Sequence, residues 1–373
     1  MTVDIRGTNE KNKGALLMVE AVCERLGPHA ELSANPFAAS WETRARLGLR
    51  QTLHDFNAIR AANVVGDLVP GRLKERYGLV ADNDLTGIVD ASGFAYSDSF
   101  ALGRHRREAV YGRRWAKRGV PKILLPQAFG PFNDPEKRKW CAEVVNQATV
   151  TFARDEKSLE YVRALAPGAR VELSPDFTIG LSPQSGPNVL NGAVALVPNQ
   201  KMVSEGILER QAYLDTMVEL AQAARAHGLT ELVVVLHEDD DVKLGTDLAR
   251  LLDCPLRLPE PPRALKHTLG TASLVISSRF HAIVGALSQR VPTVAVGWSH
   301  KYAELLRDFD VPNWLWTPGS AAGDVLDAVL SDGEALNRLE VAHKTLTDRN
   351  DQMWETVISA LGLPPRKEST GVI

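Results

Sequence analysis

The chain has 373 residues, of which 44% are hydrophobic and 24% charged, and its formal net charge at pH 7 is −3. This length suits two domains of ordinary size, and the composition is that of a globular protein with enough apolar material for two cores. A net charge so close to zero gives no general attraction to polyanions, so we expect no nucleic-acid partner.

Targeting and metal-binding signals are weak along the whole sequence. The first residues lack the apolar centre of a signal peptide, and no apolar run approaches the ~20 residues that span a bilayer. The three cysteines, Cys23, Cys141 and Cys254, are far apart and lack metal-ligand spacing. The sequence therefore predicts a cytoplasmic protein with neither a disulfide framework nor a metal site.

The amino-terminal segment has the pattern of a strand, a loop and a helix. Residues 3–6 predict a strand, the polar segment GTNEKNKG at 7–14 predicts a loop, and residues 15–26 predict a helix. Asn12 and Lys13 then lie at the entrance of the helix. They can contact a substrate there, or they can form an ordinary capping turn.

Two further strands are expected at residues 63–67 and 87–90. The second ends at Asp90, which can contact an acceptor hydroxyl or serve as a base. A role in capping or in a turn is the alternative for this carboxylate.

A basic run follows at residues 103–119, where seven arginines and lysines stand against one acid, Glu108. A helix here places Tyr111 and Trp115 one turn apart for packing and leaves the basic side chains in solvent. The run is either a solvated face or a docking surface for an anionic acceptor or for anionic lipid head groups.

Two more strand ends in the first half carry polar side chains. A strand at 122–125 leads into PQAFGP at 126–131, where the amide of Gln127 can bind a sugar hydroxyl. A strand at 150–152 leads to Arg154, at the start of a helix. The alternative for Arg154 is a surface ion pair with Asp155 or Glu156.

A segment rich in proline, serine and glycine at 181–188 predicts a linker, which gives domains at 1–181 and 189–361 and a flexible tail at 362–373. In the second domain a strand at 231–236 ends in His237. The acids at 238–241 complement the dipole of the following helix, so we expect no metal there and place His237 at the lining of a cleft.

Four polar groups converge in the stretch 271–302. A buried strand at 272–276 runs directly into Ser277, Ser278, Arg279 and His281, and a helix follows. The first N–H groups of a helix bind anions, and a guanidinium adds a bidentate contact. Lys301 follows the next strand, and His281 can exchange a proton near neutral pH. Helix caps, a surface ion pair and a core histidine are the alternatives.

Several short segments carry a family resemblance. They are NKGA at 12–15, PQAFGP at 126–131, RDEKS at 154–158, SRFHA at 278–282, VP at 291–292 and HKY at 300–302. Together they resemble the polysaccharide pyruvyl transferases, which move a pyruvyl group from phosphoenolpyruvate onto a sugar as a ketal. Alternating strand and helix signals and this resemblance imply an α/β fold with two Rossmann-like, doubly wound domains facing across a cleft, as in glycosyltransferase-B proteins.

The resemblance also implies that the arginine of RDEKS, Arg154, lies in the active centre. With the strand-end argument, it assigns roles to the candidate residues. The catalytic candidates are His281, Arg154 and Asp90; the donor-binding candidates are Arg279, Lys301, Ser278 and Arg154; the acceptor-binding candidates are Asn12, Lys13, Gln127 and His237.

The expected partners are phosphoenolpyruvate, which is a co-substrate with no further cofactor, and a sugar, polysaccharide or lipid-linked oligosaccharide acceptor. The basic run also allows a contact with the inner face of the membrane. Two alternatives are a nucleotide-sugar-dependent glycosyltransferase of the same fold and a non-catalytic carbohydrate-binding protein.

Overall fold

The computed structural model describes residues 1–53 and 66–365 and divides the chain into two compact units. Unit 1 contains residues 1–10, 18–177 and the chain from Arg349 onward, and unit 2 contains residues 11–17 and 178–348. The strand expected at 63–67 and the tail expected at 362–373 fall partly outside the described residues.

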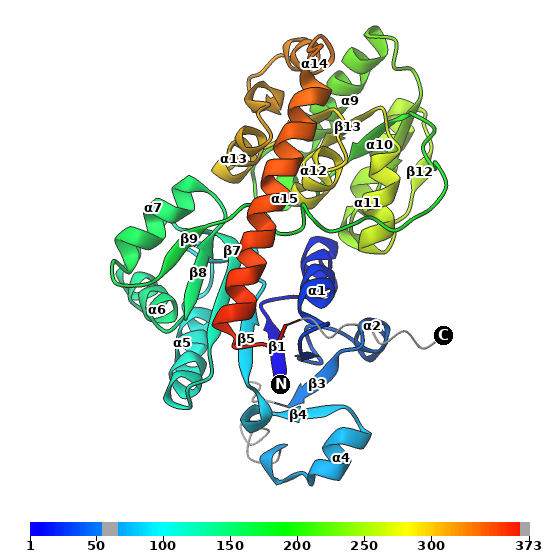
Figure 1. Cartoon of the computed structure of the whole chain (residues 1–373). Helices are drawn as coiled ribbons and strands as arrows, with labels where there is room; N and C mark the ends of the chain where they lie inside the picture. The colour runs from blue at the N-terminus through cyan, green and yellow to red at the C-terminus, as the bar shows by residue number, and fades with distance from the viewer. Residues whose placement is uncertain (54–65, 366–373) are drawn as a thin grey trace. The chain divides into compact units, whose positions relative to one another are not determined.

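The sheet of unit 1 is parallel at every described strand pair (Figure 1). In sheet order its strands are β4 (Leu79–Ala81), β3 (Arg50–Leu53), β2 (Glu31–Ala34), β1 (Thr2–Arg6), β5 (Gly87–Asp90), β7 (Lys122–Phe129), β8 (Val150–Ala153) and β9 (Val171–Leu173). A short strand, β6 (Phe94–Tyr96), pairs with β7 outside this path. The helices are α2 (Trp41–Leu47), α4 (Gly71–Arg76), α5 (Leu102–Lys117), α6 (Pro135–Asn146) and α7 (Glu156–Leu165), together with residues 18–26 of α1 (Lys13–Leu26), whose first turn belongs to unit 2.

The sheet of unit 2 is also parallel at every described strand pair. Its strands, in sheet order, are β12 (Leu256–Arg257), β11 (Leu232–Val235), β10 (Val194–Val197), β13 (Leu274–Ser277), β14 (Thr293–Val296) and β15 (Leu315–Trp316). The helices are α8 (Lys201–Ser204), α9 (Arg210–Ala226), α10 (Val242–Leu252), α11 (Pro262–Gly270), α12 (Phe280–Leu287), α13 (His300–Asp308) and α14 (Ala322–Leu330). Helix α15 (Ala335–Ala360) belongs to unit 2 up to residue 348 and to unit 1 from Arg349 onward.

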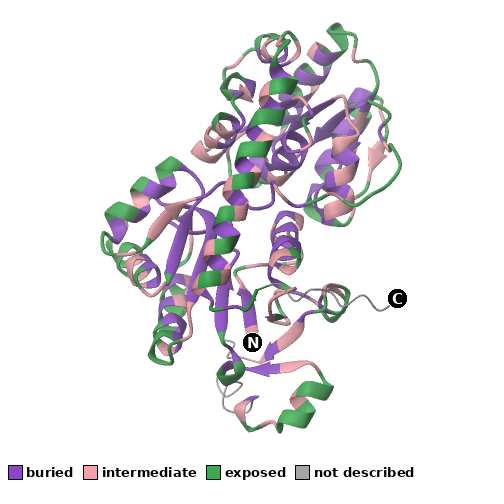
Figure 2. Ribbon diagram, in the orientation of Figure 1, coloured by how far each residue is buried: buried purple, intermediate pink, exposed green. Residues whose placement is uncertain are grey.

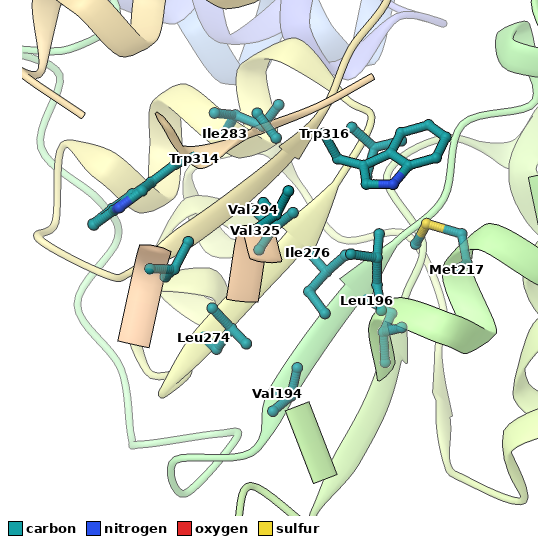
Figure 3. Close-up of a cluster of buried hydrophobic side chains, with 14 of the residues drawn as sticks. Val194, Leu196, Met217, Leu274, Ile276, Ile283, Val294, Trp314, Trp316 and Val325 are labelled. Atoms are coloured by element: carbon teal, nitrogen blue, oxygen red, sulfur yellow. The ribbon is translucent and has the colours of Figure 1, made fainter. Parts of the chain in front are cut away.

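The central strands are apolar at successive positions because helices cover both faces of each sheet. In β10, Val194 and Leu196 face a cluster that includes Met217 of α9, as Figure 3 shows. Ala195 and Val197 face a second cluster on the other side, built largely from α11 and α12. Figure 2 shows the same contrast between buried strands and partly exposed helices.

The expected α/β class with two Rossmann-like parallel sheets is therefore confirmed. In such sheets the loops at the carboxyl ends of the strands are the usual place for a ligand. No helix among the described residues has the length and apolar character that crossing a bilayer requires.

Candidate functional site

The turn between β13 and α12 is fixed by its own serines. The Oγ of Ser277 accepts a hydrogen bond from the backbone N–H of Arg279 at 3.0 Å. The hydroxyls of Ser278 and Tyr213 lie 2.6 Å apart, and the carbonyl of Ser278 accepts from the Tyr302 hydroxyl at 3.0 Å and from Asn199 at 2.9 Å. Ser278 is fully buried. These contacts hold the turn in place, and the direct donor contact expected for Ser278 stays a prediction.

Arg279 is buried and lies between two carboxylates. Its guanidinium is 2.7 Å from Glu238 and 2.5 Å from Asp241. Burial alone would lower the pKa of Arg279, but the two carboxylates outweigh burial and raise it. Burial raises the pKa of Glu238, and Arg279 opposes that shift. The surface ion pair considered above is thus a buried one, and any anion that binds Arg279 competes with these two acids.

Three of the predicted site residues lie together in unit 2. Lys13, His237 and His281 line one small cavity of about 10 Å³. The rest of its wall comes from Leu17, from Ala282 and from α11, which contributes apolar side chains and Lys266. A cavity of this volume has room for about one water molecule. The cavity joins the first turn of α1, the end of β11 and the first turn of α12, which are far apart in the sequence.

The surroundings of His237 favour its neutral form. Its side chain is buried, and burial, followed by the charges of Arg279, His281 and Lys13, lowers its pKa well below 6.5. Its Nδ1 makes no hydrogen bond within the described residues and lies 3.9 Å from Glu238 Oε1. A neutral ring with a nitrogen in this position can accept a hydrogen bond or a proton from a bound ligand.

A glycine determines how close α1 comes to His281. A Cβ atom on Gly14 would lie 2.2 Å from His281 Nδ1, a distance that real side chains do not tolerate. Asn12 begins the same helix, since its Oδ1 accepts from the backbone N–H of Ala15 at 3.0 Å. The capping alternative for Asn12 is therefore present in the structure, and its expected contact with an acceptor stays a prediction.

Lys301 lies among three aromatic rings at the end of β14. Its Nζ is 5.6 Å from the ring centroids of Phe280 and Trp298 and 5.2 Å from that of Tyr302. Cation–π attraction of this kind holds an ammonium group in place without neutralising its charge. Spacing along the chain does not predict that these rings meet, because Phe280 and Lys301 come from different elements.

In unit 1, Asp90 is buried and has both carboxylate oxygens in use. Its Oδ1 accepts hydrogen bonds from the backbone N–H and the hydroxyl of Ser92, and its Oδ2 accepts from the Tyr96 hydroxyl at 2.5 Å. This is the turn role considered as the alternative for Asp90. Catalysis by Asp90 would require one of these hydrogen bonds to be exchanged.

Arg154 follows β8 and pairs with Asp176 at 3.3 Å, with both side chains buried. Its backbone N–H donates to the carbonyl of Gln127 at 3.0 Å, so the ends of β7 and β8 are joined. Asp155 caps α7 by accepting from the N–H of Ser158 at 2.7 Å. Arg154 therefore lies where the sequence placed it, and its role in the active centre stays a prediction.

The amide of Gln127 is fully buried, and neither its Oε1 nor its Nε2 has a hydrogen-bond partner within the described residues. Such a group costs free energy unless a ligand or water satisfies it. We expect Gln127→Met, which keeps the side-chain length, to raise the free energy of unfolding by roughly 1–3 kcal/mol. Denaturant titration measures this.

The matched control for that variant is Gln211→Met, at an exposed position of α9. There the free energy of unfolding should change by less than about 0.5 kcal/mol. A destabilised Gln127→Met protein would mean that the amide is satisfied in solution. The unpaired amide would then no longer indicate that Gln127 contacts a ligand.

A larger hollow of about 400 Å³ lies elsewhere in unit 2 and contains none of the candidate residues. Its wall includes Arg338, which pairs with Asp332 and lies 3.7 Å from Asp310. We place the candidate site of unit 2 at the carboxyl ends of β11 and β13, because His237 and Arg279 follow these strands.

Sequence reasoning missed Glu238 and Asp241 as partners of Arg279, since acids before a helix predict only a dipole effect.

Comparisons with known proteins show the family and the fold of the chain. A model of the polysaccharide pyruvyl transferase family matches residues 12–300. No curated relative matches the chain closely enough to add to this.

Solved structures show the fold. The chain is similar to a putative UDP-N-acetylglucosamine 2-epimerase from Listeria monocytogenes, at a TM-score of 0.62 and 12% identity over 100% of this chain and 99% of that one. It is also similar to the UDP-GlcNAc 2-epimerase from Neisseria meningitidis bound to UDP-GlcNAc, at a TM-score of 0.58 and 12% identity over 96% of this chain and 99% of that one. A third similar structure is a glycotransferase of kitacinnamycin, at a TM-score of 0.53 and 13% identity over 97% of this chain and 99% of that one. These proteins share the glycosyltransferase-B type of fold, and the match over residues 12–300 shows that the chain belongs to the polysaccharide pyruvyl transferase family.

Proposed function

We propose that this protein transfers a pyruvyl group from phosphoenolpyruvate onto two hydroxyls of one sugar, in a cell-surface polysaccharide or its precursor, and so forms a ketal. The family match over residues 12–300 carries the proposal. The grouping of Lys13, His237 and His281 around one cavity supports it, because the reaction needs both positive charge and proton transfer.

The chemistry requires two proton movements. The first sugar hydroxyl adds to C2 of phosphoenolpyruvate, and a proton goes to the methylene carbon, which becomes the methyl group. The C2–O bond to phosphate then breaks, the second hydroxyl adds to C2, and its proton leaves with phosphate. His281 is our candidate for these transfers, and Lys13 and neutral His237 lie beside it.

Anion binding is the second requirement, since the donor carries a phosphate and a carboxylate. Lys301 is our first candidate, because it lies in the first turn of α13, which follows β14, and three aromatic rings help to hold its ammonium group in place there. Arg279 contributes only if the donor competes with Glu238 and Asp241. Arg154 and Asp90 stay proposed catalytic residues, and Asn12 and Gln127 are proposed to contact the acceptor.

Thermal denaturation with separate ligands tests the donor. Phosphoenolpyruvate is expected to raise the midpoint, whereas UDP-sugars and free glycans alone should not. Stabilisation by UDP-sugars alone would favour the second candidate function, a nucleotide-sugar-dependent glycosyltransferase. That candidate rests on the likeness in fold to a glycotransferase and to epimerases that act on UDP-GlcNAc.

Phosphate release should continue in a chelator. We propose that cationic side chains, and not a divalent metal, neutralise the donor, so EDTA is expected to leave turnover within about twofold of the untreated rate. Loss of turnover in EDTA that returns with magnesium or manganese would contradict this.

Gly14→Ala is expected to lower turnover on the order of 10²-fold, because the new Cβ would displace the His281 ring from the donor. Crowding of this kind typically costs about 1–3 kcal/mol of folding stability, so turnover is compared per amount of folded protein. The matched control is Gly323→Ala in α14, where nothing lies within 4 Å of the added Cβ and turnover should be normal. Normal turnover in Gly14→Ala would show that the placement of His281 does not matter.

A further inference from the structure

The outer side of α5 carries a continuous stripe of positive charge. Arg106, Arg107, Val110, Arg113 and Lys117 are all exposed, and their spacing of three and four residues places them on one face of the helix. The helix has six basic residues and one acid, in a chain whose net charge is −3. The charge of this protein is therefore unevenly distributed, and this helix is one of its positive regions.

Helix α6 extends the stripe, since its aromatic side chain lies against the basic residues of α5. The centroid of the Trp140 ring lies 5.7 Å from Cζ of Arg106, 5.6 Å from Cζ of Arg113 and 5.8 Å from Nζ of Lys139. Arg138 and Lys139 are also exposed. We call this surface the α5–α6 basic face, with the members Arg106, Arg107, Val110, Arg113, Lys117, Arg138, Lys139 and Trp140.

Acids neutralise only part of this face. Arg113 pairs with Glu143 at 2.6 Å, and Arg107 lies 4.0 Å from Glu108. Arg106 and Lys117 form no ion pair with any residue in the described part of the chain. Like charges gathered around one indole repel each other, so an anion brought to this face would relieve that repulsion.

We propose that the α5–α6 basic face docks the protein on membranes that contain anionic phospholipids. Clusters of four to eight basic residues bind such membranes, and each contributes roughly a fivefold gain in partitioning. The face also has apolar and amphipathic side chains, since Val110 is 51% exposed and Trp140 is half-buried beside the cations. These groups suit the boundary between lipid head groups and acyl chains better than they suit an acidic glycan.

Sedimentation with vesicles tests the proposal on the full chain. The protein should bind vesicles of phosphatidylglycerol and phosphatidylcholine at low salt, should not bind vesicles of phosphatidylcholine alone, and should dissociate as the salt concentration rises. Arg106→Glu with Lys117→Glu is expected to weaken partitioning about tenfold or more. The variant loses the contact of Arg106 with Trp140 and places an acid at the carboxyl end of α5, so its thermal midpoint should fall slightly, and partitioning is compared on the folded protein.

The control is Lys243→Glu with Lys344→Glu, the same change of charge at exposed positions of unit 2, which should bind vesicles normally. If the control lost vesicle binding to the same extent, the effect would depend only on the net charge of the protein, and the proposal would be overturned. Absence of vesicle binding would also overturn it. If polygalacturonate bound through Arg106 and Lys117 while vesicles did not, the face would be a site for an acidic glycan instead. Because vesicle binding needs no donor or acceptor, its outcome is independent of the transferase reaction.

Discussion

Replacing His281 by glutamine is expected to lower turnover by about 10²–10⁴ and to leave phosphoenolpyruvate binding nearly unchanged. Glutamine keeps a polar side chain in the first turn of α12 but cannot exchange a proton near neutral pH. Phosphate release measures turnover, and calorimetry with phosphoenolpyruvate measures donor binding. A selective loss of turnover would identify His281 as a catalytic residue.

The control for this variant is His227→Gln, because His227 is an exposed histidine of the same unit. Its turnover should be normal. If His281→Gln instead lost folding stability and kept near-normal specific activity in its folded fraction, His281 would be a structural histidine. The proton would then have to come from another group.

Arg279→Ala is expected to lower the free energy of unfolding by about 3–5 kcal/mol at neutral pH, because it leaves Glu238 and Asp241 buried without their cation. The defect should depend on pH. Without the guanidinium, burial raises the pKa of Glu238 further, so its charged form is disfavoured in the fold. The penalty is complete above that raised pKa and fades as pH falls toward the ordinary value of 4.5.

Denaturant titrations of the wild type and the variant across this pH range give the comparison. Adding Glu238→Gln and Asp241→Asn to Arg279→Met removes all three charges and should recover much of the lost stability. A loss that is independent of pH, or one that the triple variant does not reduce, would mean that Arg279 contributes through packing. Donor affinity is better tested with Lys301→Ala, since Lys301 lies among rings and its loss should weaken phosphoenolpyruvate binding.

The local structure of the site was predictable because it depends on neighbouring residues. The apolar run at 272–276 and the residues that follow predicted a strand, a turn and a helix, and β13 and α12 have that arrangement. The turn after Asp90 was likewise among the expected possibilities, and the structure shows how Ser92 forms it. A short apolar run and the residues that directly follow it are enough to predict such local features.

The partners of the charged side chains were not predictable, because they come from distant segments. Arg279 and Asp241 are 38 residues apart, and only the pairing of β10 with both β11 and β13 brings them close. The approach of Gly14 to His281 joins the first turn of α1 to the second sheet. Spacing within one segment cannot show such contacts, so Arg279 was interpreted as a freer cation than the structure allows.

The most direct measurement is the joint yield of phosphate and ketal. The protein is incubated with phosphoenolpyruvate and a panel of glycosides of common hexoses and N-acetylhexosamines, and both products are measured, phosphate by colour assay and the ketal by mass spectrometry. We predict that one acceptor or more gives phosphate and pyruvyl ketal in equal amounts, and that His281→Gln gives neither at a comparable rate. Phosphate without ketal, or sugar transfer from UDP-sugars with no reaction of phosphoenolpyruvate, would contradict the proposed function.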